Sequence, residues 1–246
     1  MPHRRIYLKI KGSQIIVESL VRENVEYMFG YPGGVVIPIF HEIYNAPIKF
    51  VLSRHEQGAI HAADGYARAS GKPGVVLATS GPGATNLITG IATAHLDSIP
   101  LVVFTGQVST AMIGNDAFQE VDVTGITRPI TKHNYLVQDV ADLARIIKEA
   151  FYIATTGRPG PVVIDVPVDI SNSLHKFEYP EKISIRGYKP TYEGHPGQIQ
   201  KACKLIEESS KPVIYAGGGV VLSNASDELR HFVKKTGIPI TTTLLG

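Results

Sequence analysis

The sequence alternates between short apolar runs and segments of helical periodicity, and this alternation limits the fold more than any other feature. Apolar runs that fit strands are 27–30, 50–53, 75–79, 101–105 and 161–166, and a further run ends at Val137. The segments between them fit helices: one that Ser13 opens as an N-cap, then 35–44, 56–70 (ended by Gly71), 84–95 and 139–155. Continuous apolar strands joined through helices are typical of a parallel sheet with helices on both faces. We therefore expect an α/β fold over residues 13–170.

A second, smaller α/β segment follows a stretch without periodicity. Residues 171–196 contain Pro180, Pro190 and Pro196 among many charges, which predicts a linker. Residues 197–246 then fit a helix (197–208), a strand (212–216), a glycine run, a helix (227–235) and a strand (238–242). Two strands are too few for a stable domain. We expect these residues to begin a second, Rossmann-like domain that is truncated at Gly246.

Composition excludes several classes of protein. With 43% hydrophobic and 19% charged residues, the chain is not of the disordered class. The net charge is only +2, and the basic residues Arg4, Arg5, Lys9 and Lys11 fall in residues 1–12, which we expect to be a solvated arm. Nucleic acid is therefore not an expected partner, and no apolar run is long enough for a membrane helix. The single cysteine, Cys203, falls in a helix and is expected to be a buried thiol; with no disulfide possible within the chain, we expect a cytoplasmic protein.

Polar and glycine-rich segments follow four of the predicted strands, where ligands bind in open parallel sheets. Each alone is a weak signal. Gly81-x-Gly83-x-x-Asn86 departs from the dinucleotide fingerprint, and His55, His61 and His95 lack the spacing of metal ligands, so no metal site is expected. Glu56 begins a helix of small residues, which suits either an acid stabilised by the helix dipole or a functional carboxylate.

Six ordered motifs, taken together, resemble the thiamine-diphosphate enzyme superfamily and, within it, the large subunits of acetohydroxyacid synthase, also called acetolactate synthase. They are Tyr-Pro-Gly-Gly (31–34), Arg-His-Glu (54–56), Ser-Gly-Pro-Gly-Ala-Thr-Asn (80–86), Asp-Ala-Phe-Gln-Glu (116–120), Thr-Lys-His (131–133) and Gly-Arg-Pro-Gly-Pro-Val (157–162). The resemblance runs from about residue 12 to residue 246. It implies that residues 13–170 are a pyrimidine-binding domain and that residues 197–246 open a central, FAD-associated domain.

The resemblance also implies a set of site residues. Glu56 matches the glutamate bonded to N1′ of the cofactor's aminopyrimidine, where it promotes the tautomer whose 4′-imino group removes the C2 proton. Pro32, Gly33, Pro82 and Asn86 match the pocket around that ring. Phe118 and Gln119 match residues on the substrate side, although Phe118 alone also suits a core aromatic. The residues that match FAD contacts are Arg158, Gly217, Gly218, Gly219, Thr243 and Leu244.

For a complete subunit the resemblance implies decarboxylation of pyruvate and its addition to a second 2-ketoacid, giving 2-acetolactate or 2-aceto-2-hydroxybutyrate in branched-chain amino-acid biosynthesis. It implies thiamine diphosphate, Mg²⁺ and a structural FAD, a homodimer or tetramer, and a regulatory small subunit. The Gly-Asp-Gly motif of the diphosphate-binding domain, which holds Mg²⁺, does not occur here, so we expect the chain alone to be inactive.

Some positions depart from the family's usual pattern. Val168 replaces the lysine of Pro-Lys-Asp, and Ser109, Thr110 and Ala111 replace a proline and basic residues. Two alternatives therefore stay open at this stage. One is another carboligase or decarboxylase of the superfamily, such as a glyoxylate carboligase, and the other is a non-catalytic binding or dimerisation piece of a split assembly.

Overall fold

The computed structural model describes residues 9–246, and the chain divides into two compact units, Met1–Pro190 and Thr191–Gly246. The first eight residues of the expected basic arm, with Arg4 and Arg5, lie outside the described residues. The two units are described separately below.

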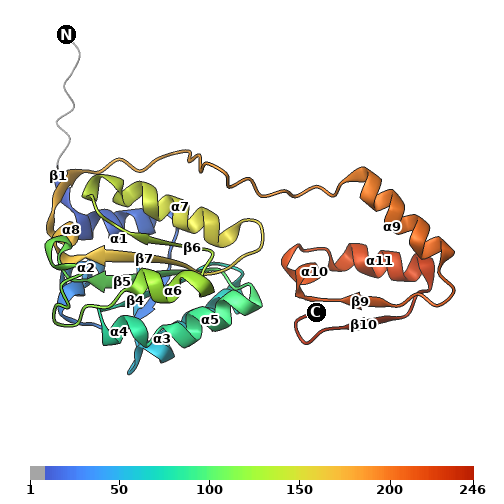
Figure 1. The fold of residues 1–246 in the computed structure, drawn as a ribbon, viewed down its shortest axis with the longest axis horizontal. Helices are drawn as coiled ribbons and strands as arrows, with labels where there is room; N and C mark the ends of the chain where they lie inside the picture. The colour runs from blue at the N-terminus through green and yellow to red at the C-terminus, as the bar shows by residue number, and fades with distance from the viewer. Residues whose placement is uncertain (1–8) are drawn as a thin grey trace, which may run out of the picture. The chain divides into compact units, whose positions relative to one another are not determined.

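A six-stranded parallel sheet forms the centre of the first unit (Figure 1). Its strands lie in the order β3-β2-β4-β5-β7-β6, and every neighbouring pair is parallel. Their bounds are β2 (Tyr27–Gly30), β3 (Lys49–Leu52), β4 (Gly74–Ala78), β5 (Leu101–Gln107), β6 (His133–Leu136) and β7 (Val162–Pro167). The predicted parallel α/β fold is confirmed.

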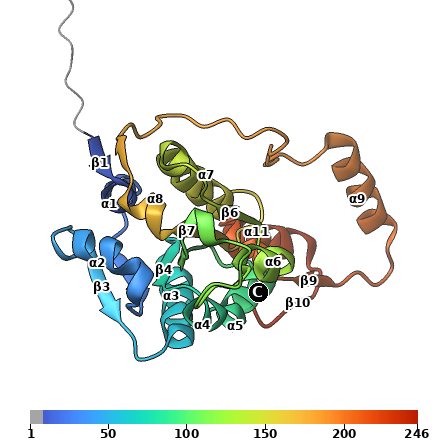
Figure 2. The same ribbon diagram turned by 60° about the vertical axis from the view of Figure 1, so that its left-hand side comes forward.

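Helices cover both faces of this sheet, because alternate residues of the central strands point to opposite sides. Val75 and Leu77 of β4 pack with α1, α2 and α7, whereas Val76 and Ala78 pack with α3 and α5. Figures 1 and 2 show α1 and α7 on one side of the strands and α3 and α5 on the other. The bounds are α1 (Gly12–Arg22), α2 (Ile37–Tyr44), α3 (Glu56–Ser70), α5 (Ile88–Asp97) and α7 (Leu143–Thr155).

Short helical turns complete the connections. The helix predicted over 84–95 is divided into α4 (Pro82–Thr85) and α5, and Gly71 ends α3 with a left-handed φ of 71°, as predicted. The remaining turns are η1 (Gly34–Val36), η2 (Thr110–Met112), α6 (Val123–Thr127), η3 (Arg128–Ile130) and η4 (Val140–Asp142).

Ser13 is not the N-cap of the first helix. The cap is Lys11, and Ser13 lies inside α1, fully buried, with its hydroxyl unpartnered among the described residues. The first residue of the helix, Gly12, packs directly against the chain at residue 170: a Cβ there would lie 2.1 Å from the carbonyl oxygen of Ile170.

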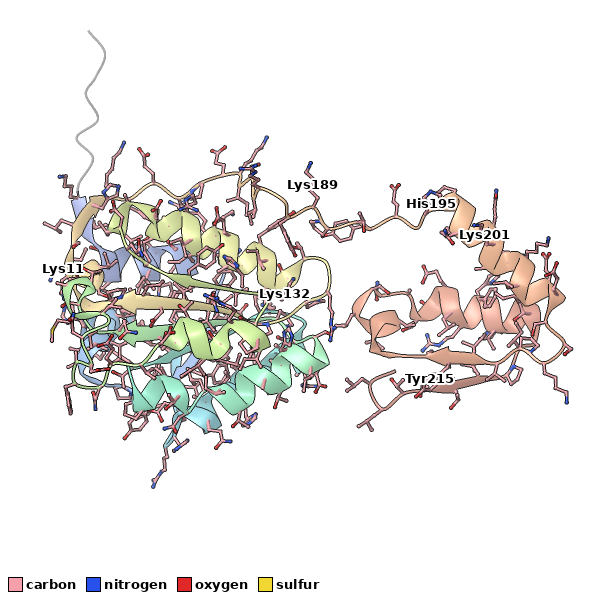
Figure 3. All side chains as sticks on the ribbon, in the orientation of Figure 1. Lys11, Lys132, Lys189, His195, Lys201 and Tyr215 are labelled. Atoms are coloured by element: carbon pink, nitrogen blue, oxygen red, sulfur yellow. The ribbon has the colours of Figure 1, made fainter. Side chains whose placement is uncertain are left out.

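The expected arm and the expected linker pair with each other over a short stretch. β1 (Lys9–Lys11) and β8 (Leu174–Lys176) form an antiparallel pair, and α8 (Val168–Asn172) connects β7 to it. Later in the expected linker, Tyr188 also contacts the first unit. Lys132 (labelled in Figure 3) donates to the Tyr188 hydroxyl at 3.1 Å and to the Thr156 carbonyl oxygen at 2.7 Å. Residues up to Tyr188 therefore pack on the first unit.

The second unit is one βαβ arrangement preceded by a helix. It contains α9 (Pro196–Glu208), β9 (Ile214–Ala216), α10 (Gly218–Leu222), α11 (Ser226–Thr236) and β10 (Ile240–Thr242), and its two strands are parallel. Few side chains are covered: Tyr215 on β9, labelled in Figure 3, is 72% exposed. The expectation of a buried Cys203 was wrong, since this thiol is exposed on α9, a helix with no buried residue.

Candidate active site

The carboxyl ends of β2, β3 and β4 lie side by side, and the polar segments of the sequence follow them. Parallel pairing places Gly30 beside both Leu52 and Leu77. The segments 31–34, 53–56 and 79–86 therefore leave the sheet together at the carboxyl end of its strands, which is called this edge below. Open parallel sheets bind ligands there.

Glu56 is the central charged group at this edge. It is the first residue of α3, is only 8% exposed, and follows His55, whose Nδ1 accepts a hydrogen bond from the Gln57 amide at 3.1 Å. Its Oε2 accepts a hydrogen bond from Nδ2 of Asn86 at 2.9 Å. Its Oε1 has no hydrogen-bond partner within residues 9–246. The helix dipole favours a carboxylate at this position. Oε1 is not among the described buried atoms that lack a partner, so this oxygen is reached from solvent and can bond a ligand.

Two glycines allow close backbone packing near the Glu56 carboxylate. A Cβ on Gly83 would lie 3.3 Å from Glu56 Oε1 and 2.7 Å from Cγ2 of Thr79, and a Cβ on Gly33 would lie 2.4 Å from Cβ of Thr79, so neither position has room for a side chain. The hydroxyls of Thr79 and Ser80 are buried without a partner in the part of the chain that is described. A carboxylate oxygen without a protein partner, beside backbone that only glycine can supply, suits a flat, polar ligand such as an aminopyrimidine ring.

The other residues that the resemblance places around the aminopyrimidine ring lie in the segments 31–34 and 79–86. Pro32 is exposed directly before Gly33, and Pro82 is exposed in the first turn of α4. The structure therefore brings together Pro32, Gly33, Glu56, Pro82 and Asn86, which the sequence places up to 54 residues apart.

The segment that carries Phe118 and Gln119 approaches this edge from β5. Gly81 has a left-handed φ of 57°, and a Cβ on it would lie 2.5 Å from the carbonyl oxygen of Gln119. Phe118 is 87% exposed, so it is not a core aromatic. The Glu120 carboxylate accepts hydrogen bonds from the amides of Gly114 at 2.5 Å and Ala117 at 2.8 Å, which lower the pKa of Glu120.

Sequence reasoning missed a buried acid one strand further along the sheet. Asp165 on β7 is 2% exposed and accepts hydrogen bonds from the Thr105 hydroxyl at 2.7 Å and from Nε2 of Gln107 at 2.9 Å. Burial raises its pKa to about 7, against the lowering effect of these two hydrogen bonds, and the charge of Asp122 adds to the rise. The available signal was an acid inside an otherwise apolar strand.

The raised pKa of Asp165 predicts a pH-dependent stability. Because the folded-state pKa of about 7 exceeds the ordinary 3.8, the folded state holds this proton more tightly. The stabilisation is complete below pH 4 and is lost as the pH rises toward 7. Between pH 5 and 8 the free energy of unfolding should fall by up to about 3 kcal/mol from this group, at ~1.4 kcal/mol per pKa unit. Denaturant unfolding of wild type and Asp165→Asn checks this, since the slope should be absent in the variant. Parallel pH profiles would contradict it.

Arg158 lies at the opposite end of the sheet from Glu56. It precedes β7, and its guanidinium donates to the Ser98 hydroxyl at 2.7 Å and to the Leu96 carbonyl oxygen at 3.1 Å, at the end of α5. Ser98 in turn precedes β5. The structure therefore does not bring Arg158 to the site around Glu56.

The glycines of the second unit lie beside its C-terminal residues. Gly217 follows β9, Thr243 follows β10, and the Thr243 amide donates to the Ala216 carbonyl oxygen at 2.8 Å. Gly218 and Gly219 begin α10, and Leu244 is fully exposed. Residues 217–219 and 243–244, predicted together as FAD contacts, are thus neighbours in the structure.

Residues 9–246 offer neither a metal-ligand cluster nor a membrane-spanning helix. None of these residues form a cluster of three or more His, Cys, Asp or Glu side chains that suits a metal ion. None of the described helices is both long enough and apolar enough to span a membrane.

Two stretches of the chain match the models of known protein families. Residues 10–126 match the N-terminal TPP binding domain of thiamine pyrophosphate enzymes, and residues 199–246 match the central domain of the same enzymes. The chain therefore carries sequence of the N-terminal and central domains of thiamine pyrophosphate enzymes, as its motifs indicated.

Among individual proteins, the chain is similar to acetolactate synthase large subunits. It is 52% identical over 240 residues to the acetolactate synthase large subunit of Buchnera aphidicola subsp. Schizaphis graminum, and 50% identical over 240 residues to the isozyme 3 large subunit of Escherichia coli K12. A probable acetolactate synthase large subunit of Methanocaldococcus jannaschii is 52% identical over 240 residues. These alignments cover 96% of this chain but only 41–42% of the relatives. The chain thus spans less than half the length of the relatives it matches.

Proposed function

We propose that this chain is the pyrimidine-binding part of an acetolactate synthase large subunit, together with the start of its central domain. The complete subunit would decarboxylate pyruvate and join the product to a second 2-ketoacid, giving 2-acetolactate or 2-aceto-2-hydroxybutyrate. The observation that carries the proposal is the buried Glu56, whose Oε1 accepts no hydrogen bond within residues 9–246 and lies beside the backbone of Gly83. The similarity to acetolactate synthases over 96% of the chain supports it.

In this proposal each residue has a limited task. Thiamine diphosphate, when bound, supplies the carbanion chemistry. Glu56 would hold a proton at Oε1 for a ring nitrogen of the bound cofactor, and Asn86 holds Oε2 so that the carboxyl keeps its orientation. Gly33 and Gly83, next to Pro32 and Pro82, would let the backbone approach a flat ring closely. Phe118 and Gln119 bound the substrate side, where an exposed aromatic ring can exclude water from the ketoacid.

The proposal extends to other cofactors and to partners. The Mg²⁺ ligands would come from a diphosphate-binding domain outside this sequence. FAD would be held by Arg158 and by residues 217–219 and 243–244, of which the last two groups lie together. A homodimer or tetramer, a regulatory small subunit and a cytoplasmic location complete the proposal; the name "large subunit" of the relatives supports the small subunit.

A chimeric enzyme tests the proposal directly. This chain would replace the matching N-terminal part of the E. coli isozyme 3 large subunit, to which it is 50% identical, and acetolactate would be measured after pyruvate is added. We expect formation of acetolactate that depends on added thiamine diphosphate, and none from the 246-residue chain alone. A folded chimera that makes no acetolactate would contradict the proposal. A preference for glyoxylate over pyruvate would favour the carboligase alternative.

A further inference from the structure

Gln107, the last residue of β5, uses the whole hydrogen-bonding capacity of its side-chain N–H groups. Its Nε2 donates to Oδ2 of Asp165 and to the carbonyl oxygen of Val121, both at 2.9 Å. Its Oε1 accepts from the Val108 amide at 2.9 Å. A glutamine amide has two N–H donors, and here both are used. The side chain is 3% exposed, so water does not compete for these bonds.

Three groups determine which way this amide faces. The Oδ1 of Asp165 is held by the Thr105 hydroxyl and its Oδ2 accepts from Gln107. The Val121 carbonyl oxygen only accepts hydrogen bonds and the Val108 amide only donates, so Gln107 must turn Nε2 toward Val121 and Asp165. Oε1 is then directed to the Val108 amide. The β5–β7 register fixes this arrangement, because it pairs Thr105 with Asp165.

These hydrogen bonds hold the two ends of residues 108–122, called the site loop below. Val108 and Val121 stand at its two ends, and the single side chain of Gln107 binds both of them. Near its start, Thr110 donates from its amide (3.1 Å) and hydroxyl (2.5 Å) to the Asp169 carboxylate. Near its end, Gln119 lies against Gly81. The loop thus closes on Gln107 and presents Phe118 and Gln119 beside the turn that carries Pro82 and Asn86.

We propose that Gln107, oriented by Asp165, is a positioning residue that fixes the site loop and thereby places Phe118 and Gln119 on the substrate side of the site. The effect of the loop position on the substrate rests on the proposed function, whereas the fixing of the loop by Gln107 is independent of that function.

Hydrogen–deuterium exchange on the 246-residue chain tests the fixing of the loop. The variant Gln107→Leu retains bulk but removes all three hydrogen bonds, and exchange in residues 108–122 should rise by about 10-fold or more, as expected for the loss of buried hydrogen bonds. Thr105→Val is the matched control, since it removes a hydrogen bond to the same carboxylate but none to the loop. It should lower the stability of the unit without a selective rise in the loop.

A second variant covers the case in which Gln107→Leu does not fold. Asp165→Leu keeps about the size of the side chain but removes the oxygen that accepts from Gln107, so one N–H of the Gln107 amide loses its partner. It too should raise loop exchange above that of Thr105→Val. The proposal is overturned if neither variant does so, or if exchange rises equally throughout the first unit.

The chimeric enzyme provides the kinetic readout. Gln107→Leu should lower kcat/KM for pyruvate by about 10-fold or more. The thiamine diphosphate concentration for half-maximal activity should stay within about twofold, because the hydrogen bond between Glu56 and Asn86 does not involve Gln107. An equal effect of Thr105→Val on kcat/KM would overturn the positioning role. An inactive wild-type chimera would instead count against the proposed function, while the exchange result would still decide whether Gln107 fixes the loop.

Discussion

Glu56→Gln is expected to lower acetolactate formation by the chimeric large subunit by about 10²–10⁴-fold, the range for removal of an acid–base group. Glutamine retains the size of the side chain and can still bond Asn86, but its amide cannot share a proton with a ring nitrogen. The loss should appear in kcat at saturating thiamine diphosphate, and it is measured by the rate of acetolactate formation from pyruvate.

Glu18→Gln is the matched control for this prediction. Glu18 is an exposed acid on α1, so the same change there should leave the rate unaltered. Unfolding by denaturant should show that Glu56→Gln is at least as stable as the wild-type chain, because a buried carboxylate is replaced by a neutral amide. Retention of activity by a folded Glu56→Gln chimera would exclude the role assigned to Glu56.

The sheet was predictable from the sequence because its strands are buried on both faces. All residues of β4 and β5 are buried, and β4 and the first four residues of β5 appear in the sequence as uninterrupted apolar runs. The edge strand β3 is exposed apart from the half-buried Phe50, yet the helices before and after it in the sequence placed it within one residue of its observed bounds. Repeated strand–helix alternation compensates for weak individual strands.

The elements that were missed lack such local signals. β1 and β8 are three residues long, contain mostly polar side chains, and form only through pairing between residues 9–11 and 174–176. α10 begins with Gly218 and Gly219, and glycine is a poor helix former. Cys203 was misplaced because the burial of a helical residue depends on what packs against the helix, and α9 has no buried residue.

The site shows the same division between local and long-range information. The ordered motifs placed Glu56, Pro82 and Asn86 at strand ends, and the sheet brings those ends together. The hydrogen bond between Glu56 and Asn86 joins residues 30 positions apart, and that between Gln107 and Asp165 joins residues 58 apart. Such bonds depend on strand order and register, which a pattern of apolar runs does not specify. The role of Asp165 therefore required the structure.

Gly81→Ala is expected to lower the activity of the chimera by about 10²-fold, the effect of displacing site residues by about 1 Å. Two effects act in the same direction. The φ of 57° at Gly81 is unfavourable for alanine, and the new Cβ would lie 2.5 Å from the Gln119 carbonyl oxygen. Since that neighbour is backbone, the site loop must move away from the turn that carries Pro82, and Phe118 and Gln119 move with it.

Gly65→Ala separates this effect from a general response to glycine replacement. Gly65 lies in α3 with nothing within 4 Å of an added Cβ and without a positive φ, so the change should preserve activity and stabilise the helix by up to about 1 kcal/mol. Acetolactate formation and denaturant unfolding, measured for both variants, distinguish displacement of the loop from loss of fold. A Gly81→Ala chimera with wild-type kcat and KM would show that the contact between the turn and the loop does not position the substrate side of the site. An inactive chimera that unfolds at a much lower denaturant concentration would show instead that the turn mainly supports the fold.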